Sequence, residues 1–336
     1  MQGCTDEMSR RMLDMIGSAW VTRAICSAVE LGVPDALPDT PAALAPRLGC
    51  HEDALTRLLR ALVSLEVCEW RDGVVALTAL GQTLRRDHPQ SVRGWAQWWG
   101  TQLWPLWGEM TRCVQTGHSA RQLLYGQTGY AHLDDAATAD RFHEAMVSVS
   151  RLVAESLAES LDMTGVHQVL DVGGGQGELV VQLLHKHPAL HASIQDLPHA
   201  LEGAKQRLAL EGLQDRCMLV DSSFFERVVE GADLLLLKSI LHNWSDEQAL
   251  MILQRCREAM KPGARLVLVE RLLPSGDASN ASDAAALRSD LNMLVSLPGR
   301  ERSEAQYRQL LQAAGFTWTA THPTPPEFYL VEAALG

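Results

Sequence analysis

The sequence predicts an α/β protein: a doubly wound, mostly parallel sheet preceded by an α-helical, winged-helix-like domain. From residue 166 onward, short apolar runs alternate with amphipathic segments, an order typical of parallel strands connected by helices. The first run stops at a cluster of glycines, as a strand does before a tight turn and a helix. Residues 40–84 follow the order helix, turn, helix and hairpin. At 336 residues, the chain is long enough for both domains.

The N-terminal segment, residues 1–100, is expected to be a dimerisation domain. A helix over residues 8–37, closing at residues 31–34, precedes the helix–turn–helix pattern, and the hairpin turns at residues 71–73. Winged helices often bind DNA, but phosphate contacts require clustered basic side chains. Residues 1–100 contain ten Arg, no Lys and twelve acidic residues, and the whole chain has a net charge of −12. We therefore expect no nucleic-acid partner.

Residues 101–160 are expected to form a helical linker that contributes helices to a substrate pocket. Five of the nine tryptophans fall within residues 95–107. These indoles either pack between helices or form the wall of a flat, apolar pocket, and the two interpretations are compatible. A long helix over residues 137–160 carries Met146 on its apolar side and leads into the third segment, residues 161–336.

The third segment is expected to contain the parallel sheet. Its strands are predicted at residues 166–172, 189–195, 216–220, 233–237 and 265–269, and its helices at residues 178–187, 198–211, 246–260 and 304–314. Ser245 with Gln248, and Ser303 with Gln306, have the spacing of capping boxes at two of the helix starts. The tail, residues 316–333, is expected to form an antiparallel hairpin with a Pro-rich connection.

Residues 171–177 form a glycine-rich loop with the pattern D-x-G-x-G-x-G. Glycine is needed there because the backbone turns sharply, partly at positive φ, and a ligand lies directly against it. The dinucleotide fingerprint requires a third glycine five residues after the first, where this chain, counted from Gly173, has Glu178. The spacing instead resembles motif I of S-adenosylmethionine (SAM)-dependent methyltransferases. Such a loop holds no pyrophosphate and need only admit a methionine moiety and a ribose.

Polar residues follow the predicted strands at the edge of the sheet where ligands bind in open α/β folds. Asp196, Asp221, Lys238 and Glu270 end strands two to five. The carboxylate of Asp196 is suited to accept hydrogen bonds from both ribose hydroxyls of a nucleoside. The alternative is that Asp196 only caps the helix over residues 198–211.

The segment LLLLKSILHNWSDEQ supplies a candidate general base, His242. Glu270 ends the neighbouring strand, and Glu301 begins another helix close to the same cleft. A carboxylate on the second nitrogen of an imidazole fixes its tautomer and raises its basicity. Such a base can deprotonate a phenol, whose pKa is about 10, and so make it a nucleophile. A lone histidine is more often a structural loop residue, but the Lys-x-x-x-His spacing, the following Trp-Ser-Asp and the paired glutamates favour the base.

The cysteines and the N-terminus indicate a cytoplasmic protein. The seven cysteines are scattered without a C-x-x-C pair, which suits reduced thiols and offers neither a disulfide framework nor a zinc site. His185, His187 and His191 flank a predicted helix end, where solvated histidines are more common than metal ligands. No apolar run reaches membrane-spanning length, and the N-terminus has no signal-peptide core. We expect no metal and no membrane partner.

Several stretches together resemble one family. These are LDVGGGQG, the Asp-Leu-Pro-His of 196–199, LLLKSILHNWSDE, LVLVERLLP, DLNMLVSLPGRERS and LLQAAGF. They are similar to the SAM-dependent O-methyltransferases typified by plant caffeate and isoflavone enzymes and by bacterial natural-product tailoring enzymes. The resemblance covers nearly the whole chain. It implies a class I methyltransferase, Rossmann-like fold, an intertwined homodimer, metal-independent catalysis, SAM as cofactor and S-adenosylhomocysteine (SAH) as product.

The resemblance also implies roles for particular positions. His242 is the general base, flanked and oriented by Glu270 and Glu301. The positions that match cofactor contacts are Gly173, Gly175, Asp196, Ser223, Phe224 and Lys238. The positions that match the acceptor pocket are Met146, Trp244, Asn292 and Met293.

Two positions depart from the family pattern. After strand three the family has Gly-Asp-Phe-Phe or Gly-Asp-Met-Phe, where this chain has Ser222-Ser223-Phe224-Phe225. The acid beside the adenine is therefore missing, and either Asp221 or Ser223 takes its place. Plant enzymes have Asp after the histidine where this chain has Asn243, which changes the charge close to the substrate.

These features predict an O-methyltransferase that acts on a phenolic or enolic hydroxyl of a flat, polycyclic secondary metabolite. One alternative is transfer to nitrogen or carbon, or a SAM-assisted reaction without methyl transfer, on the same fold. Another is a winged-helix ligand sensor, which the acidic N-terminal segment disfavours. The residues do not identify the acceptor.

Overall fold

The computed structural model describes residues 2–127, 129–274, 283–325 and 327–336. They divide into two compact units, Met1–Trp104 and Pro105–Gly336. The first boundary lies close to the predicted end of the dimerisation domain at residue 100. From residue 105 on, the predicted helical linker belongs to the same unit as the sheet. Within the described ranges, no helix has both the length and the apolar character needed to cross a bilayer.

The first unit contains the predicted helix–turn–helix and hairpin. Its elements are α1 (Gln2–Glu30), α2 (Val33–Ala36), α3 (Pro41–Arg47), α4 (Glu52–Ser64), β1 (Cys68–Arg71), β2 (Val74–Leu77), α5 (Ala79–Gln82), α6 (Arg93–Trp98) and the π-helix η1 (Trp99–Leu103). The predicted helix over residues 8–37 is divided in two, and the break lies at the predicted closing residues 31–34. Gly32 adopts a left-handed φ of 77° and Pro34 lies in the first turn of the next helix, so the chain breaks between α1 and α2.

The hairpin turn follows from its sequence. Asp72 and Gly73 both have positive φ, 50° and 82°, which is the conformation of a two-residue type I′ turn. β1 and β2 pair antiparallel, and their Val75 joins Leu44 and Leu59 in the core of this unit. The large apolar side chains of α1 between Met8 and Val21 are exposed.

The tryptophan-rich segment is partly core. Trp98 is buried, and the rings of Trp95 and Trp99 form a T-shaped pair. A Cβ added at Gly100 would lie 2.0 Å from Glu30 Oε1, a carboxylate that Arg23 holds in place. The backbone therefore approaches α1 very closely, and the chain widens into a π-helix that 3.6-residue periodicity does not predict.

The second unit begins with helices. These are α7 (Trp104–Trp107), α8 (Met110–Thr116), α9 (Ala120–Tyr125), the 3₁₀ turn η2 (Ala131–Asp134) and the long α10 (Ala136–Ser160). α10 confirms the predicted long helix.

The seven-stranded sheet has the order β10-β11-β7-β6-β3-β4-β5. Its strands are β3 (Gln168–Val172), β4 (His191–Asp196), β5 (Cys217–Asp221), β6 (Leu234–Lys238), β7 (Arg265–Glu270), β10 (Phe316–Thr324) and β11 (Phe328–Leu335). Strands β3 to β7 are parallel, and the hairpin β10–β11 adds antiparallel strands at the β7 edge. The doubly wound sheet and its closing hairpin are as predicted, although residue 326 of the Pro-rich connection lies outside the described residues.

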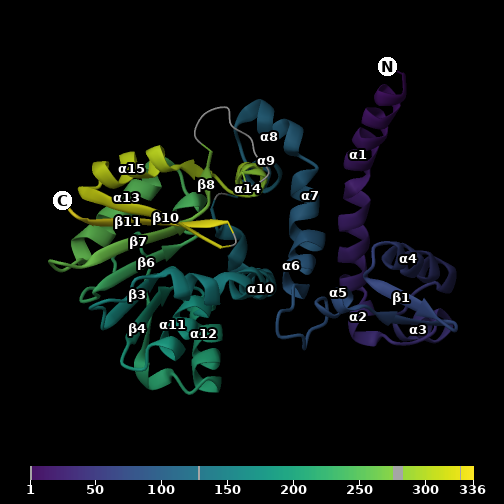
Figure 1. Cartoon of the computed structure of the whole chain (residues 1–336), viewed down its shortest axis with the longest axis horizontal. Coiled ribbons are helices and arrows are strands. Elements are labelled where there is room, and N and C mark those ends of the chain that lie inside the picture. Colours follow the sequence, from purple (N-terminus) through teal and green to yellow (C-terminus); the bar gives the residue numbers. More distant parts are fainter. Residues whose placement is uncertain (1, 128, 275–282, 326) are drawn as a thin grey trace. The chain divides into compact units, whose positions relative to one another are not determined.

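Helices cover both faces of this sheet (Figure 1). They include α11 (Glu178–Lys186), α12 (Pro198–Leu210), α13 (Asp246–Ala259) and α15 (Glu304–Ala313), and the 3₁₀ turns are η3 (Gln214–Arg216) and η4 (Leu241–Asn243). A further helix, α14 (Ala284–Ser296), packs instead against α8, α9 and the segment after β7. Alternate strand residues enter opposite cores: Val169 packs with α10, α11 and α12, and Leu170 packs with α13 and α15. Both predicted capping boxes form.

The strand order reverses between β3 and β6. From this point β3, β4 and β5 follow one another toward one edge of the sheet, and β6 and β7 follow toward the other edge. Open α/β sheets bind ligands at such a switch point, beyond the carboxyl ends of the strands. The predicted site residues follow β3, β4, β6 and β7, so the topology gathers them at this edge. A small parallel pair of strands, β8 (Leu272–Leu273) with β9 (Arg302–Ser303), was not predicted. β8 comes soon after Glu270 in the sequence, and β9 comes directly after Glu301.

Candidate active site

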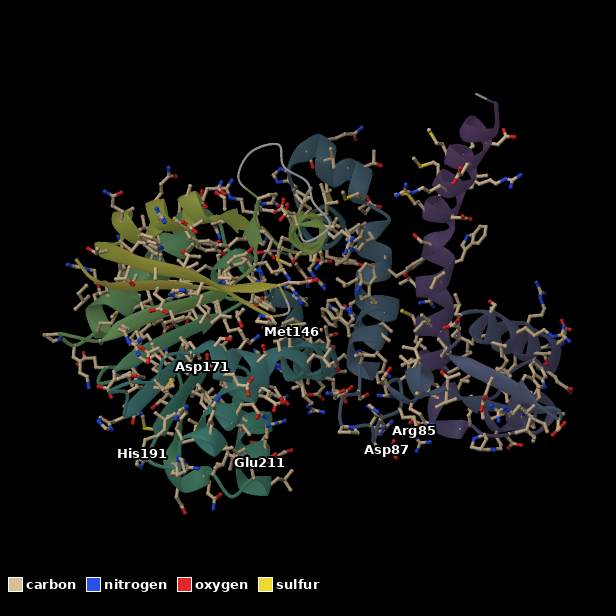
Figure 2. The ribbon with its side chains drawn as sticks, viewed as in Figure 1. Arg85, Asp87, Met146, Asp171, His191 and Glu211 are labelled. Carbon is tan, nitrogen blue, oxygen red and sulfur yellow. The ribbon has the colours of Figure 1, made fainter. Side chains whose placement is uncertain are left out.

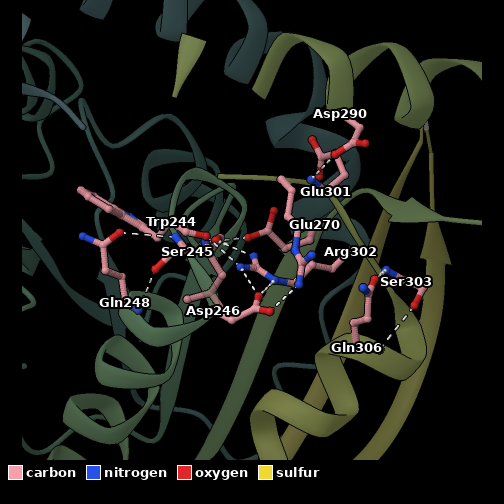
Figure 3. A network of polar contacts seen from close by, with 12 residues as sticks. Trp244, Ser245, Asp246, Gln248, Glu270, Asp290, Glu301, Arg302, Ser303 and Gln306 are labelled. Atoms are coloured by element: carbon pink, nitrogen blue, oxygen red, sulfur yellow. Dashed lines mark hydrogen bonds and ion pairs between the residues drawn. The ribbon is translucent and has the colours of Figure 1, made fainter. Parts of the chain in front are cut away.

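The structure brings His242, Glu270 and Glu301 together. His242 lies in η4 just after β6, Glu270 is the last residue of β7, and Glu301 precedes β9. Nδ1 of His242 lies 3.0 Å from Glu301 Oε1 and 3.6 Å from Glu270 Oε2. All three side chains are buried. Glu270 and Glu301 are both drawn in Figure 3.

Further contacts fix the two carboxylates. Glu301 Oε1 also accepts a hydrogen bond from Ser289 Oγ at 2.6 Å, and the Glu301 amide donates to Asp290 Oδ1 at 2.9 Å. Because Nδ1 faces the acids, Nε2 is the ring nitrogen that remains for a substrate hydroxyl.

The backbone around His242 is also held. Glu270 Oε1 accepts hydrogen bonds from the amides of Ile240 and Leu241, at 3.2 and 2.9 Å. The side-chain amide of Asn243 donates to the carbonyl oxygen of Ser239 at 2.9 Å and is buried. An aspartate carboxylate has no proton to donate to that carbonyl. Asn243 therefore acts within the loop, a role that the sequence pattern did not suggest.

The electrostatics of this cluster favour a charged imidazole. Burial alone would lower the pKa of His242, but the charges of Glu301 and Glu270 outweigh it and raise the pKa above 6.5. Burial acts to raise the pKa of Glu301, yet the His242 charge and the hydrogen bonds from His242 and Ser289 prevail and lower it. Burial raises the pKa of Glu270. The imidazole is thus a stronger base than a solvated histidine.

The glycine loop between β3 and α11 has the expected geometry. Gly173, Gly175 and Gly177 have φ values of 73°, 57° and 78°, which confirms the positive-φ turn. A Cβ at Gly173 would lie 2.4 Å from Ile240 Cδ1, so the loop packs directly against the segment before His242. Gly175 donates its amide proton to Asp196 Oδ2 at 2.8 Å, which ties the loop to the end of β4.

Asp196 is not the N-cap of α12. That helix begins at Pro198 and its N-cap residue is Leu197, whose amide donates to Asp196 Oδ1. A carboxylate offers about four acceptor sites, and the amides of Leu197 and Gly175 use two of them. Asp196 therefore keeps capacity for two further hydroxyl donors. Asp221 is its register partner on β5 and is exposed.

Two more charged residues lie beneath the loop. Burial raises the pKa of the Asp171 carboxyl to about 7, although the charge of Lys238 opposes this. Lys238 donates to Ser150 Oγ on α10 at 3.0 Å, and burial lowers its pKa. A Cβ at Gly174 would lie 2.7 Å from Asp171 Cγ, so the loop rests on this carboxyl group. Lys238 and Asp171 thereby connect α10 to the loop.

The residues assigned to the adenine and the acceptor lie on several elements. The ring of Phe224 comes within 3.5 Å of a Cβ built at Gly173, while Ser223 Oγ accepts from the amide of Phe225. Trp244 packs edge-to-face on Phe225 and is largely buried, so packing is one part of its role.

Met146 lies on α10 (Figure 2). Asn292 and Met293 lie on α14, where Asn292 Oδ1 accepts from Trp107 Nε1 at 3.2 Å. That contact brings one indole of the tryptophan-rich segment to a predicted pocket residue. Ser289 on the same helix bonds Glu301, so α14 connects the acceptor side to the candidate base.

Comparisons with known proteins show the family of the chain. An O-methyltransferase domain matches residues 107–317, and an O-methyltransferase dimerisation domain matches residues 13–87. The chain is 37% identical over 341 residues to 3-amino-4-hydroxybenzoate 4-O-methyltransferase of Streptomyces cremeus, covering 99% of this chain and 92% of that protein. The solved structure of mitomycin 7-O-methyltransferase MmcR matches with a TM-score of 0.90 at 33% identity and covers 100% of both chains. Aclacinomycin 10-hydroxylase RdmB of Streptomyces purpurascens is 33% identical over 320 residues, covering 93% of this chain and 85% of that protein.

The chain belongs to the O-methyltransferase family. Solved structures of similar proteins hold SAM or SAH. The protein is a SAM-dependent O-methyltransferase with the class I methyltransferase fold, as the sequence predicted.

The methyltransferase loop fits this cofactor on its own geometry. A Cβ at Gly175 would meet no atom within 4 Å, so the backbone of the loop is open on that side. Asp196, with acceptor sites left for hydroxyls, lies directly beside it. Among the described residues, no hydrogen-bond partner meets Asp171 Oδ1. These features suit a ligand that lies against the loop and presents both hydroxyl and ammonium donors.

Sequence reasoning missed several residues that shape the methyltransferase site. Ser289 and Asp290 hold Glu301, and Arg302 contacts the loop of His242. The stretch PGRERS led to the prediction of Glu301 as a site residue. It also contains two arginines, Arg300 and Arg302. Nothing in their spacing indicates which of them is buried.

Proposed function

We propose that this enzyme methylates a phenolic or enolic hydroxyl of a flat aromatic natural product, with His242 as general base. The observation that supports this most is the contact between Nδ1 of His242 and Glu301, backed by Glu270. It fixes the ring, raises its basicity and leaves Nε2 for the hydroxyl proton.

Each residue then has one task. Nε2 of His242 takes the hydroxyl proton as the oxygen lone pair forms the new bond to carbon. The charges of Glu301 and Glu270 stabilise the imidazolium that results. When bound, SAM supplies the methyl group as an electrophile and leaves as the neutral thioether SAH. Gly173, Gly175, Asp196, Ser223, Phe224 and Lys238 are proposed to hold it.

The acceptor is proposed to be planar and aromatic. Met146, Trp244, Asn292 and Met293 are proposed to line its pocket, and the Trp107–Asn292 contact adds an indole there. The similar Streptomyces cremeus enzyme is named for a hydroxybenzoate. Hydroxylated benzoates, naphthoates and phenazines are therefore suitable first candidates.

A second reaction has one specific observation behind it. RdmB, which is similar to this chain, is named a hydroxylase and not a methyltransferase. The buried base and both acids favour O-methylation here, because proton removal from a hydroxyl is the task they fit.

Mass analysis of products distinguishes these reactions. The purified enzyme is incubated with methyl-labelled SAM and a panel of 3-amino-4-hydroxybenzoate, hydroxynaphthoates and hydroxyphenazines. The methyl ether of each phenol serves as the matched control. We expect the label on oxygen with at least one phenol and no product from the ethers. Label on nitrogen or carbon, or a product that gains oxygen instead of methyl, would contradict the proposal.

We also propose that the enzyme is a homodimer in the cytoplasm and works without a metal. The dimerisation domain and the exposed apolar side chains of α1 support pairing. His242, Glu270 and Glu301 are a group whose ligand atoms lie within 4.8 Å, near enough to hold a metal ion. Nδ1, however, is already engaged with Glu301. Full activity after dialysis against EDTA is expected, and loss that zinc restores would overturn the metal-free mechanism.

A further inference from the structure

Arg302 is fully buried and holds the loop that carries His242 by its main chain. Its Nη1 donates to the carbonyl oxygen of Leu241 and its Nη2 to the carbonyl oxygen of Trp244, both at 2.8 Å. These two carbonyls flank His242 in the sequence. Arg302 thus spans the base with the two arms of one planar guanidinium.

The carboxylate of Asp246 also binds the guanidinium of Arg302. Nε of Arg302 donates to Asp246 Oδ1 at 2.9 Å, and Nη2 lies 2.8 Å from the same oxygen (Figure 3). The Tyr307 ring lies 5.9 Å from the guanidinium carbon. A buried charge is costly unless its donors are used. Here the donors go to two backbone carbonyls and a carboxylate, so the charge is compensated only while the loop keeps this shape.

The loop is held by two buried side chains that bind different backbone groups. Glu270 accepts from the amides of Ile240 and Leu241, and Arg302 donates to the carbonyls of Leu241 and Trp244. All amide and carbonyl contacts fall within one turn of chain. One acceptor, Glu270, and one donor, Arg302, therefore both bind the backbone around the base.

The same turn contains local strain. Ser239, which begins it, has a φ of 55°, a left-handed conformation that is unfavourable for a residue other than glycine. A Cβ at Gly299 would lie 2.0 Å from the carbonyl oxygen of His242, so the chain before Arg302 presses directly on the turn. A strained turn relaxes when its restraints are removed. A shift of about 1 Å in a catalytic group can cost about 10²-fold in rate.

We propose that Arg302 is a positioning residue for the base. It fixes the main chain of residues 241–244, while the neighbouring Glu301 fixes the imidazole ring. Two successive residues, Glu301 just before β9 and Arg302 at its start, thus set the side chain and the backbone of His242. This inference rests on the proposed function of His242 as general base, and Arg302 acts only through it.

Arg300 provides a matched control. It reaches the same carboxylate, Asp246, from the solvent side, and its own side chain is about half exposed. Arg300→Gln removes a positive charge and an Asp246 partner while the carbonyl contacts of Arg302 stay in place. Arg302→Lys keeps the charge but lacks the planar fork that reaches two carbonyls at once.

The test is a double-mutant cycle on single-turnover rates. Rates are measured with methyl-labelled SAM and the phenol of the panel that gives the highest turnover, and SAH affinity is measured by calorimetry. Arg302→Gln should lower the rate by about 10- to 100-fold and leave SAH affinity nearly unchanged. Arg300→Gln should lower the rate by less than about twofold, because an exposed ion pair contributes little. Arg302→Lys should fall between the two.

The second half of the cycle uses the His242→Ala background. There Arg302→Gln should change the residual rate by less than about twofold, because no base remains to be positioned. An equal fold-loss in both backgrounds would show that Arg302 only supports the fold and would overturn the proposal. If Arg302→Gln does not bind SAH, Arg302→Lys takes its place in the cycle, and failure of both to bind SAH also overturns it.

The cycle separates this proposal from the proposed function. Wild-type rates in His242→Ala would remove His242 as the base from the mechanism, and with it the positioning role of Arg302. An inactive His242→Ala together with a fully active Arg302→Gln would leave the base in place and reject only the role of Arg302.

Discussion

Glu301→Gln removes one negative charge beside the base but leaves an oxygen that still accepts from Nδ1. The carboxylate oxygen lies 3.0 Å from Nδ1 of His242, closer than the Glu270 oxygen at 3.6 Å. An opposite charge at such a distance favours the charged form of the imidazole, so we expect its removal to lower the pKa of His242. A general base acts in its neutral form. The acid limb of the rate profile, which the raised pKa of His242 displaces toward higher pH in the wild type, is therefore expected to move to lower pH.

The assay is kcat/KM for the acceptor as a function of pH at saturating SAM, which reports the pKa of the enzyme's essential base. The plateau rate at high pH should also fall, because the imidazole becomes a weaker base. Glu304→Gln is the control: its carboxylate is partly exposed, pairs with Arg308 and lies outside the cluster. An acid limb that stays in place, or moves to higher pH, in Glu301→Gln would refute the electrostatic reasoning.

Three further substitutions test other parts of the structure. Gly175→Ala and Gly165→Ala both place a side chain at positive φ with no atom within 4 Å, so each should destabilise by about 1 kcal/mol; calorimetry with SAH should show an affinity loss of about tenfold or more only for Gly175→Ala. Gly299→Ala forces a Cβ to 2.0 Å from a carbonyl oxygen of the base loop; thermal unfolding should show a loss of about 1–3 kcal/mol, with turnover reduced, and unchanged values would contradict the close packing. Trp20→Glu, at a side chain that is 81% exposed on α1, should convert dimer to monomer in light scattering, whereas Leu80→Glu, exposed on α5, should not; a dimer that survives Trp20→Glu would rule out pairing through this face of α1.

Much of the catalytic edge of the sheet was predictable because it depends on local patterns. Strand ends are marked in the sequence where apolar runs stop, and parallel strands place those ends at one edge. That reasoning predicted that His242 and Glu270 would meet, since β6 and β7 are adjacent and parallel. The glycine loop was predictable for the same reason, because its positive φ values require glycine.

The contacts that hold the base were not predictable because they depend on packing between distant segments. Arg300 and Arg302 are equivalent in the sequence, yet one is half exposed and the other is fully buried. Asn243 was expected to change the charge near the substrate, whereas its amide bonds a carbonyl of its own loop. Only the fold decides which carbonyls need a donor.

The helical breaks show the same limit. The π-helix η1 replaces regular helix where Gly100 meets α1, a contact between segments about seventy residues apart in the sequence. The break between α1 and α2, by contrast, had a local signal in Gly32 and Pro34. Local breaks can be read from glycine and proline, and tertiary ones cannot.

The most direct test of the account is the single-turnover rate of His242→Ala with methyl-labelled SAM, measured beside its affinity for SAH. Loss of a general base should lower the rate by about 10²-fold or more and leave SAH affinity nearly intact, since His242 is proposed to act on the acceptor hydroxyl and not to hold the cofactor. A mutant that transfers the methyl group as fast as the wild type would contradict the assignment of His242 as the base.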